Sequence, residues 1–265
     1  MAETKKKVQH NVTQVNQATG SKEELLQKTK KNAMPYRIAA VIFWLLALTC
    51  EVFAVLFFMG KLEWSFLMNE PGHTIAWIAA LVLDLVFLII GSSLWKKGNH
   101  LDPASAKNKG KFWLQNNLGV IVAAFCFIPF IILALLDKNA DKKSKTIAAI
   151  AAVVALAIGG LVSYDWNPVS QEEMLENAGI NTVYWTQNGT VFHLTEDCYH
   201  LDQSYELMSG TSTAAIEAGK TRLCKTCEKK AEEENIIDTD KELDVVPGDS
   251  EANTENTDAS VDPAA

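Results

Sequence analysis

Four long apolar runs constrain the fold of this chain more than any other feature of its sequence. They are Ile38–Met59, Thr74–Leu94, Asn117–Leu136 and Thr146–Val162. At a rise of about 1.5 Å per residue, a helix of about 20 residues crosses a hydrocarbon core of about 30 Å. We therefore expect four transmembrane helices, with aromatic residues such as Trp95, Trp113, Tyr164 and Trp166 near their ends. The alternative, a buried helical core of a soluble protein, fits the length of the runs less well.

The segments around these runs differ sharply in composition. Residues 1–33 are rich in Lys, Gln, Thr and Asn, and we expect disorder there apart from a short helix around Lys22–Lys31. This stretch lacks the form of a cleavable secretory signal. Residues 34–166 form the predicted membrane domain, 167–181 a connector and 182–231 a metal-binding module. Residues 232–265 carry twelve acidic residues against one Lys, within a chain of net charge −8, and are predicted to be a disordered acidic tail.

The distribution of Lys and Arg predicts the orientation. Basic residues near the ends of membrane helices favour the cytoplasmic side. Such residues lie before the first run and in the loop between the second and third runs: Lys28, Lys30, Lys31, Arg37, Lys96, Lys97, Lys107, Lys109 and Lys111. The loop 60–73 has only Lys61 and fits the outside. The third loop disagrees, because Lys138, Lys142, Lys143 and Lys145 are offset only by Asp137 and Asp141. A third helix that is re-entrant at Pro129 would place the module outside instead. The charge rule favours a multipass cell-membrane protein with both termini in the cytoplasm.

His193, Cys198, Cys224 and Cys227 form the pattern His-x4-Cys-x25-Cys-x2-Cys. A Cys-x2-Cys pair presents two thiolates from one tight turn, and a further Cys and a His complete a tetrahedral set. The pattern predicts bound Zn²⁺. Because four protein ligands close the coordination shell, it also predicts a structural role. A module of about 45 residues has a small core, so the metal is expected to supply much of its folding free energy, about 10–16 kcal/mol.

Several alternatives remain open at this stage. His200 could replace His193, although His193 lies on a predicted hairpin, residues 182–185 and 191–194, around the turn Asn188-Gly189. The Cys-x2-Cys pair could be redox-active. Cys50 and Cys126 lie in apolar runs and are interpreted as small apolar fillers. Further along, a hydroxyl-capped helix over 214–218 that stops at Gly219, and a helix from Glu228 onward, are predicted.

The module resembles a known family. Around the four ligands stand Val183, Tyr184, Trp185, Thr186, Gly189, Val191, Phe192, Ala214, Glu217, Ala218, Gly219, Lys220 and Leu223. This pattern resembles a small bacterial zinc-binding module related to the metal-binding domain of the Ada DNA-repair protein, over roughly residues 181–230. In the Ada domain four Cys bind zinc and one of them accepts a methyl group from a DNA phosphotriester. Here His193 stands at the first ligand position, so the resemblance implies zinc binding but not methyl transfer. The membrane half resembles uncharacterised membrane proteins of Gram-positive bacteria, which implies no activity.

Two acidic residues interrupt the apolar runs. Glu51 lies about nine residues from the outer end of the first run and Asp84 about ten from the outer start of the second. In an antiparallel hairpin they share a depth of roughly 13–15 Å, where no Lys or Arg lies. A shared proton or a bound cation would reduce their repulsion, which predicts a proton or cation pathway. The alternative is a packing role, with each acid protonated or reaching Ser92, Ser93 or Asn117 only after the bundle rearranges.

The sequence therefore predicts an α-helical membrane protein with four transmembrane helices and a small α+β zinc-binding domain. Its expected function is interaction or sensing through the module, without catalysis; the alternative is a proton- or cation-coupled transporter or channel. Expected partners are the lipid bilayer and a protein bound by the module, and the oligomeric state is left open. Nucleic acid is disfavoured because acidic residues interleave with Lys220, Arg222, Lys225, Lys229 and Lys230. Enzyme is the weakest class, since no phosphate loop, Ser-His-Asp order or His-Glu-x2-His motif occurs.

Overall fold

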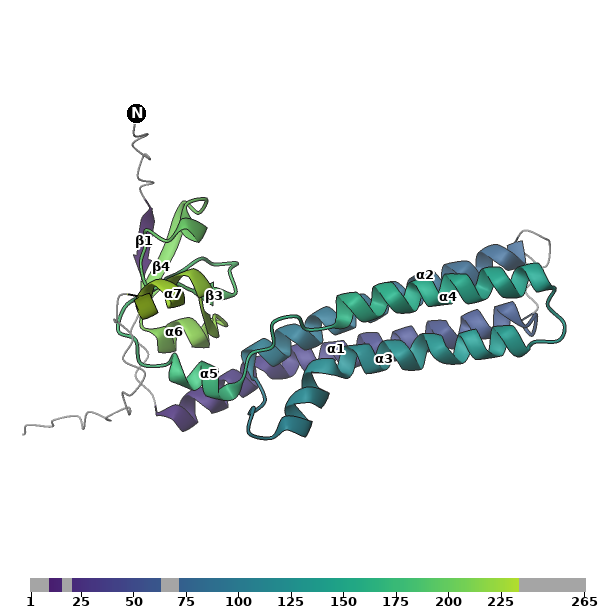
Figure 1. Cartoon of the computed structure of the whole chain (residues 1–265), viewed down its shortest axis with the longest axis horizontal. Helices are drawn as coiled ribbons and strands as arrows, with labels where there is room; N and C mark the ends of the chain where they lie inside the picture. The colour runs from purple at the N-terminus through teal and green to yellow at the C-terminus, as the bar shows by residue number, and fades with distance from the viewer. Residues whose placement is uncertain (1–9, 16–20, 63–71, 234–265) are drawn as a thin grey trace, which may run out of the picture.

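The computed structural model describes residues 10–15, 21–62 and 72–233. It has two parts, a long four-helix bundle and a small α+β module at one end of that bundle (Figure 1). The predictions for residues 1–9 and 16–20, for the loop residues 63–71 and for most of the acidic tail, 234–265, lie outside the described residues.

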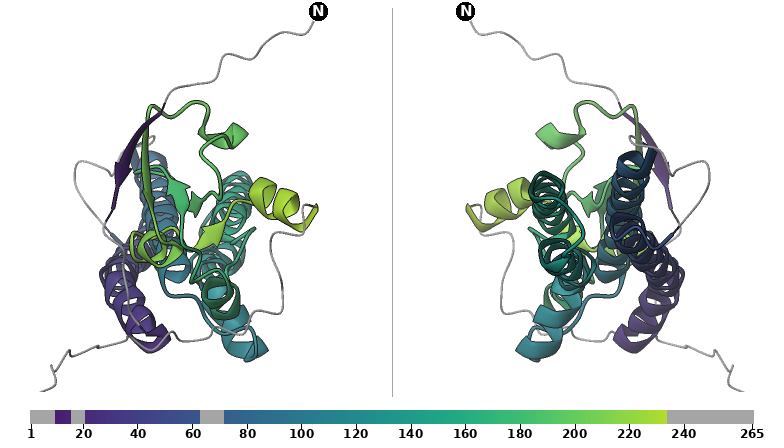
Figure 2. Two further views of the ribbon diagram at one scale, coloured as in Figure 1. Left: turned by 90° about the vertical axis from the view of Figure 1, so that its left-hand side faces the viewer. Right: turned by 90° about the vertical axis from the view of Figure 1, so that its right-hand side faces the viewer.

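The predicted four long helices are confirmed. They are α1 (Lys22–Phe58), α2 (Gly72–Leu101), α3 (Lys109–Leu136) and α4 (Lys142–Ser163), and each is long and apolar enough to cross a membrane. α1 pairs with α2 on one side of the bundle and α3 with α4 on the other (Figure 2). Pro129 lies inside α3 without ending it. α3 runs along the bundle beside α4, so the structure has no re-entrant helix at this position (Figure 1).

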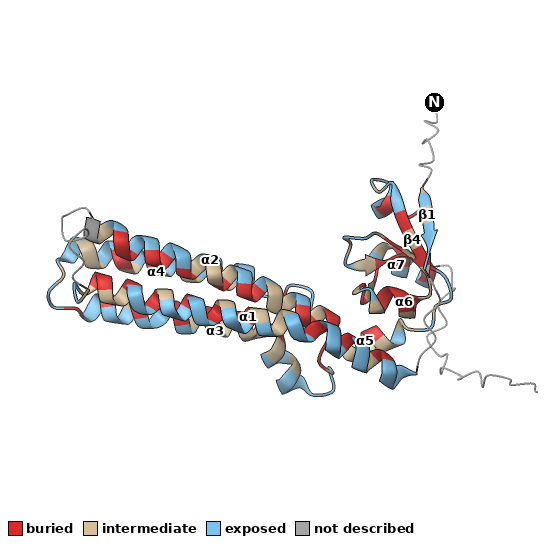
Figure 3. Cartoon of the chain, turned by 180° about the vertical axis from the view of Figure 1, so that it is seen from behind, coloured by how far each residue is buried: buried red, intermediate tan, exposed pale blue. Residues whose placement is uncertain are grey.

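The bundle is packed with aromatic and small side chains and carries apolar, mainly aliphatic, side chains on its outside. Trp44, Trp77, Phe127 and Phe130 are buried between the helices. The exposed surface holds Ile42, Leu45, Val82, Phe125, Leu136, Ile150 and Leu161. Buried and exposed residues accordingly run as stripes along the helices (Figure 3). Apolar patches of this extent are unusual on a soluble monomer and are expected of helices that face hydrocarbon.

Small residues let the helices approach closely. α1 buries Ala40, Ala47 and Ala54, which are seven residues apart, and α4 buries Ala148, Ala152, Ala155 and Gly159. This spacing places each set on one helix face. Small residues at such positions are typical of helix contacts in membranes, where van der Waals packing replaces the hydrophobic effect.

The module combines short strands with short helices. The strands are β1 (Asn11–Gln14), β2 (Val183–Trp185), β3 (Val191–Phe192), β4 (Glu206–Gly210) and β5 (Arg222–Leu223). The helical elements are α5 (Gln171–Glu176), the 3₁₀ turn η1 (Tyr199–Leu201), α6 (Ser212–Glu217) and α7 (Lys225–Glu233). One sheet has the order β1-β4-β2, with β1 parallel and β2 antiparallel to β4; β3 pairs with β5 in parallel. Its core contains Met174, Val183, Trp185, Phe192, Leu201, Leu207 and Ile216.

The module is larger than the predicted range 182–231. In the N-terminal segment, which was predicted to be disordered apart from a short helix, β1 lies along β4 as an edge strand. α1 passes without a break through the predicted boundary at residues 33 and 34, and its Leu25 is buried in the module core. The predicted connector 167–181 contains α5, whose Met174 is fully buried. Ser170 and Ser21 cap α5 and α1 by accepting hydrogen bonds from backbone N–H groups of the first turn.

The local turn predictions had mixed outcomes. Thr211 caps α6 through the N–H of Ala214, and Gly219 ends it with a φ of 85°, so the predicted capped helix and glycine stop are confirmed. The prediction of a tight hairpin turn at Asn188-Gly189 is wrong. Tyr184 and His193 do exchange both backbone hydrogen bonds, at 2.8 and 2.7 Å, but residues 185–192 lie between them. Gly189 is not among the described glycines with positive φ, and β3 pairs with β5.

Polar contacts join the helices to one another at the end of the bundle and also connect that end to the module. Arg37 of α1 donates from Nη1 to Oδ2 and from Nη2 to the backbone oxygen of Asp102, both at 2.7 Å. His100 of α2 lies 2.8 Å from Asp165, which follows α4. The connection to the module is made by Lys28 of α1, which reaches Glu217 of α6 at 3.1 Å, and by the N–H of Ala106, which donates to Glu172 of α5 at 2.8 Å. The two parts of the chain therefore share a bonded interface.

Two adjacent glycines in α4 test the close packing of the bundle. A Cβ on Gly159 would lie 2.8 Å from Cδ2 of Leu88, a side chain that is itself fully buried, whereas a Cβ on Gly160 would meet nothing within 4 Å. We expect Gly159→Ala to lower the free energy of unfolding by about 1–3 kcal/mol through overpacking. Gly160→Ala should leave it unchanged or slightly raised. Thermal unfolding of the purified protein in detergent measures both, and equal stability of the two variants would contradict this packing.

Candidate metal centre

The parallel pairing of β3 and β5 brings together two ligands that lie far apart in the sequence. Val191 pairs with Arg222 and Phe192 with Leu223. The N–H of Cys224 then donates to the oxygen of Phe192 at 2.9 Å, which extends the ladder by one step. His193 and Cys224 follow directly after the two strands. Since parallel strands end at the same edge, both side chains are delivered to one place.

The other two ligands come from helical turns. Cys224 stands immediately before α7, where the N–H of Glu228 donates to its backbone oxygen, and Cys227 lies in the first turn of that helix. Cys198 stands immediately before η1, whose Leu201 is 1% exposed and anchors the turn in the module core. The start of a helix also favours a negatively charged thiolate.

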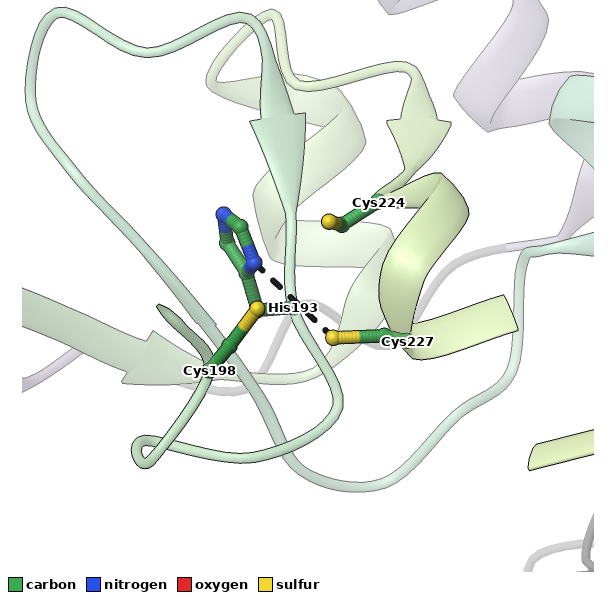
Figure 4. Close-up of side chains that lie close together, drawn as sticks. All are labelled: His193, Cys198, Cys224 and Cys227. Carbon is green, nitrogen blue, oxygen red and sulfur yellow. Dashed lines mark hydrogen bonds between the residues drawn. The ribbon is translucent and has the colours of Figure 1, made fainter. Parts of the chain in front are cut away.

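The four side chains converge on one point (Figure 4). Their ligand atoms all lie within 4.8 Å of one another, and Nδ1 of His193 is 3.9 Å from Sγ of Cys227. Ligand atoms around a tetrahedral ion with three sulfurs and one nitrogen are separated by about 3.5–3.8 Å. The observed set is slightly wider and would close by small side-chain movements. The four residues are 2–5% exposed, and every cysteine of the chain is free. The group is compatible with a bound metal ion.

Burial sets the protonation of these side chains. It lowers the pKa of His193 to about 4, with a smaller contribution from His200, so the imidazole is neutral near pH 7 as a ligand must be. Burial also raises the pKa of the Cys198 thiol to about 12, and the neighbouring Cys227 adds to this, although a backbone hydrogen bond from His200 opposes it. A cation at the centre would reverse this preference, because it stabilises thiolates.

The alternative histidine lies outside the group. His200 is exposed, its Nε2 lies 3.0 Å from the hydroxyl of Thr226, and its ring centroid is 6.5 Å from that of His193. Cys50 and Cys126 belong to the bundle. Within residues 10–15, 21–62 and 72–233, the His193 group is the only set of three or more His, Cys, Asp or Glu side chains close enough to hold one ion.

The structure also brings together the two acids that interrupt the apolar runs. Glu51 of α1 is 6% exposed and Asp84 of α2 is fully buried, and their carboxyl groups are close enough to interact electrostatically. In the part of the chain that is described, none of their four carboxyl oxygens has a hydrogen-bond partner. The polar side chains considered as alternatives are engaged elsewhere: Ser92 with Ser163, Ser93 with Ile89 and Asn117 with Trp113.

Cys126 of α3 is a third member of this buried polar group that the sequence did not indicate. Its thiol is fully buried beside Asp84. The sequence shows that Cys126 lies mid-way along an apolar run, but only the rotation of α3 in the bundle decides which helix it faces.

The chain was compared with models of protein families, with curated proteins and with solved structures, and none of the three comparisons gave a match. What the site can do therefore rests on its own geometry.

Two histidines provide a direct test of the ligand set. We expect His193→Ala to weaken Co²⁺ binding at least about tenfold, because even residues that only orient a ligand contribute 10–100-fold to affinity. His200→Ala removes an imidazole from the same module without removing a ligand, so it should bind Co²⁺ like the parent. The measurement is the visible absorption of tetrahedral Co²⁺–thiolate during titration of the full chain in detergent. Greater loss in His200→Ala than in His193→Ala would refute the assignment.

Proposed function

We propose that this protein spans the cell membrane four times and holds, at the cytoplasmic end, a module that is built around a structural zinc ion and serves interaction or sensing. The observation that carries the proposal is the convergence of His193, Cys198, Cys224 and Cys227 in a buried group. Three thiolates and one imidazole match the ligand types and the tetrahedral geometry that Zn²⁺ prefers in structural sites.

A structural role is supported by the closed ligand set. Four side chains of the chain itself would complete a tetrahedral shell, which leaves no position for a substrate or a reactive water. The ion would also join three separate pieces of the module: the end of β3, the turn before η1 and the start of α7. Catalysis therefore has no support in this geometry. The resemblance to Ada-related zinc modules agrees with zinc binding, whereas His193 at the first position removes the family's methyl-accepting arrangement.

The orientation is supported by charge. α2 ends and α3 begins at the module end of the bundle (Figure 1), and these helix ends carry Lys96, Lys97, Lys109 and Lys111. At the opposite end, Asp141 caps α4 and Asp137 is buried, and these acids partly offset the lysines there. The excess of basic residues at the module end favours the cytoplasm for both the module and the start of α1. Free cysteines agree with a reducing compartment.

An interaction role is supported by a hollow of about 500 Å³ beside the metal group. His193, His200, Arg222, Lys225 and Glu228 contribute to its walls. Polar side chains of both signs suit a protein partner better than a nucleic acid, which would require a surface of one positive sign.

Zinc content tests the proposal on the full chain. We expect about one zinc ion per chain in protein purified in detergent under reducing conditions, and loss or strong weakening in Cys198→Ser and Cys224→Ser. Cys50→Ser changes a thiol of the bundle and serves as the matched control, which should retain the metal. Proteolysis should cut the module in the two site variants and leave the bundle helices protected, because metal loss removes folding energy from the module alone.

Two results would contradict the structural zinc site. One is a parent protein that lacks zinc although its thiols are reduced; the other is a Cys224→Ser variant whose module resists proteolysis as well as the parent's. Release of the chain from vesicles by alkaline carbonate would contradict the membrane-spanning arrangement separately.

A second candidate function, proton or cation coupling, is favoured by the buried pair of Glu51 and Asp84. Two carboxyl groups without hydrogen-bond partners are costly inside a bundle, and a shared proton or a cation between them would reduce that cost.

Flux measurements test this second candidate. In proteoliposomes with a trapped pH indicator, the parent protein should dissipate a proton gradient or a cation-driven gradient, and Glu51→Gln or Asp84→Asn should abolish that flux. Glu196→Gln changes an exposed acid of the module and should conduct normally. Absence of flux in the parent, or its survival in both bundle variants, would eliminate a transport role for the pair.

A further inference from the structure

A second hollow lies at the junction between the bundle and the module. We call it the junction pocket; its volume is about 650 Å³. α2 contributes Lys96 and Lys97, the segment after α4 contributes Asp165 and Trp166, and the module contributes Lys220 and Arg222. The pocket therefore needs both parts of the chain to be docked together.

The junction pocket carries an excess of positive charge. Among its lining residues are four cations, Lys96, Lys97, Lys220 and Arg222, but only one carboxylate, Asp165, which is paired with His100 at 2.8 Å. Across the described ranges, no salt bridge joins any of these four cations to a carboxylate. Lys96 interacts electrostatically with Asp165 without forming a salt bridge, so an anion of the right size would still meet an excess of positive charge.

The cations are held in place by neutral groups. Lys220 is 7% exposed and donates from Nζ to the backbone oxygens of Gln187 and Gly189. Lys97 lies over the ring of Tyr36, with Nζ 4.8 Å from its centroid. Burial lowers the pKa of Lys220 and Lys97 adds to this, which is the expected sign for two cations that face each other without a counter-ion.

The position of the junction pocket points to a lipid. Lys96 lies just beyond the apolar part of α2 and donates to the backbone oxygen of Val162, at the end of α4, at 2.6 Å. Next to it, Tyr164 and Trp166 are 41% and 67% exposed. Exposed aromatic rings beside lysines, one turn beyond apolar helices, are typical of the headgroup level of a bilayer. Basic pockets between helices on the cytoplasmic side are a known kind of headgroup site.

We propose that the junction pocket binds the phosphate of an anionic phospholipid, with Lys96 and Lys97 on the bundle side and Lys220 and Arg222 on the module side. The proposal rests on the membrane-spanning arrangement proposed above. Its ligand is an anionic headgroup whose acyl chains lie along the exposed aliphatic surface of the bundle, and the site holds the module against the membrane that contains that lipid.

The test uses the full chain in neutral detergent and a fluorescently labelled phosphatidylglycerol as the probe. We expect saturable binding that unlabelled phosphatidylglycerol reverses and that phosphatidylcholine does not. The variant Lys96→Gln/Lys97→Gln should bind the probe about twenty-fivefold more weakly, since each lysine near the headgroup contributes about fivefold. The matched control Lys109→Gln/Lys111→Gln has the same net charge, lies at the same end of the bundle and is outside the pocket, so it should bind like the parent.

Arg222→Gln tests the module side of the pocket. It should weaken binding of the probe about fivefold while the zinc content of the same sample stays at the parent value. A variant that loses both zinc and lipid would be unfolded, and the bundle-side pair then decides the question.

Each opposite result overturns the proposal. Equal weakening in the two double variants would mean that net charge alone attracts the lipid. Displacement of the probe by inorganic phosphate or glycerol phosphate at equal concentration would mean a soluble anion site, and displacement by phosphatidylcholine would mean unselective lipid contact. Alkaline extraction from phosphatidylcholine vesicles separates the two proposals. If the chain resists extraction, these results contradict only lipid binding in the pocket; if the chain is extracted, the membrane-spanning arrangement itself is contradicted.

Discussion

The continuity of α1 is the constraint on which the rest of the structure depends. One helix carries Leu25, 3% exposed in the module core, and Trp44, 6% exposed in the bundle core. Nineteen residues of helix separate them by about 28 Å, which is a rigid spacing because every intervening residue is helical. Pro35 lies between them and removes one backbone hydrogen bond without ending the helix. The module is therefore held at a set height above the bundle, and the hydrogen bonds from Ser105 and Ala106, between α2 and α3, to Glu172 of α5 restrain its rotation.

Within the module, a metal ion would act where ordinary packing is weakest. β3 and β5 are two residues long each and pair only with each other and through one bridge to β2. So short a ladder is marginal without a further restraint. The four ligands stand at its end and at the two turns beside it, so an ion would cross-link segments that are about 30 residues apart. Closing loops of that length is entropically costly, and a bond that closes them stabilises the folded state correspondingly.

The sequence predicted the elements that local physical rules determine. It did not predict the elements whose position depends on contacts with distant segments of the chain. The four long helices followed from the length of apolar runs, and α6 followed from a hydroxyl cap and a glycine with positive φ. The spacing of the ligands indicated a four-residue group that the structure does bring together. By contrast, β1 is mostly polar and gains its place by pairing with β4, almost two hundred residues away, with Val12 against the module core. The contact of Cys126 with Asp84 depends on the rotation of α3 about its axis, which an apolar run does not encode.

β5 directly connects the candidate metal centre with the junction pocket. Arg222 lines both the junction pocket and the hollow beside the candidate metal centre, and Cys224, two residues later, is one of the four candidate ligands. Residues two apart in an extended segment point to the same side, and Leu223 between them is buried in the module core. An anion that holds Arg222 and an ion that holds Cys224 would therefore restrain the same short strand. Whichever binds first would already restrict the conformations of this strand, so the second would lose less conformational entropy on binding. Zinc and lipid should therefore raise one another's affinity by the same factor. In that arrangement the composition of the membrane would bear directly on the stability of the metal-bound module.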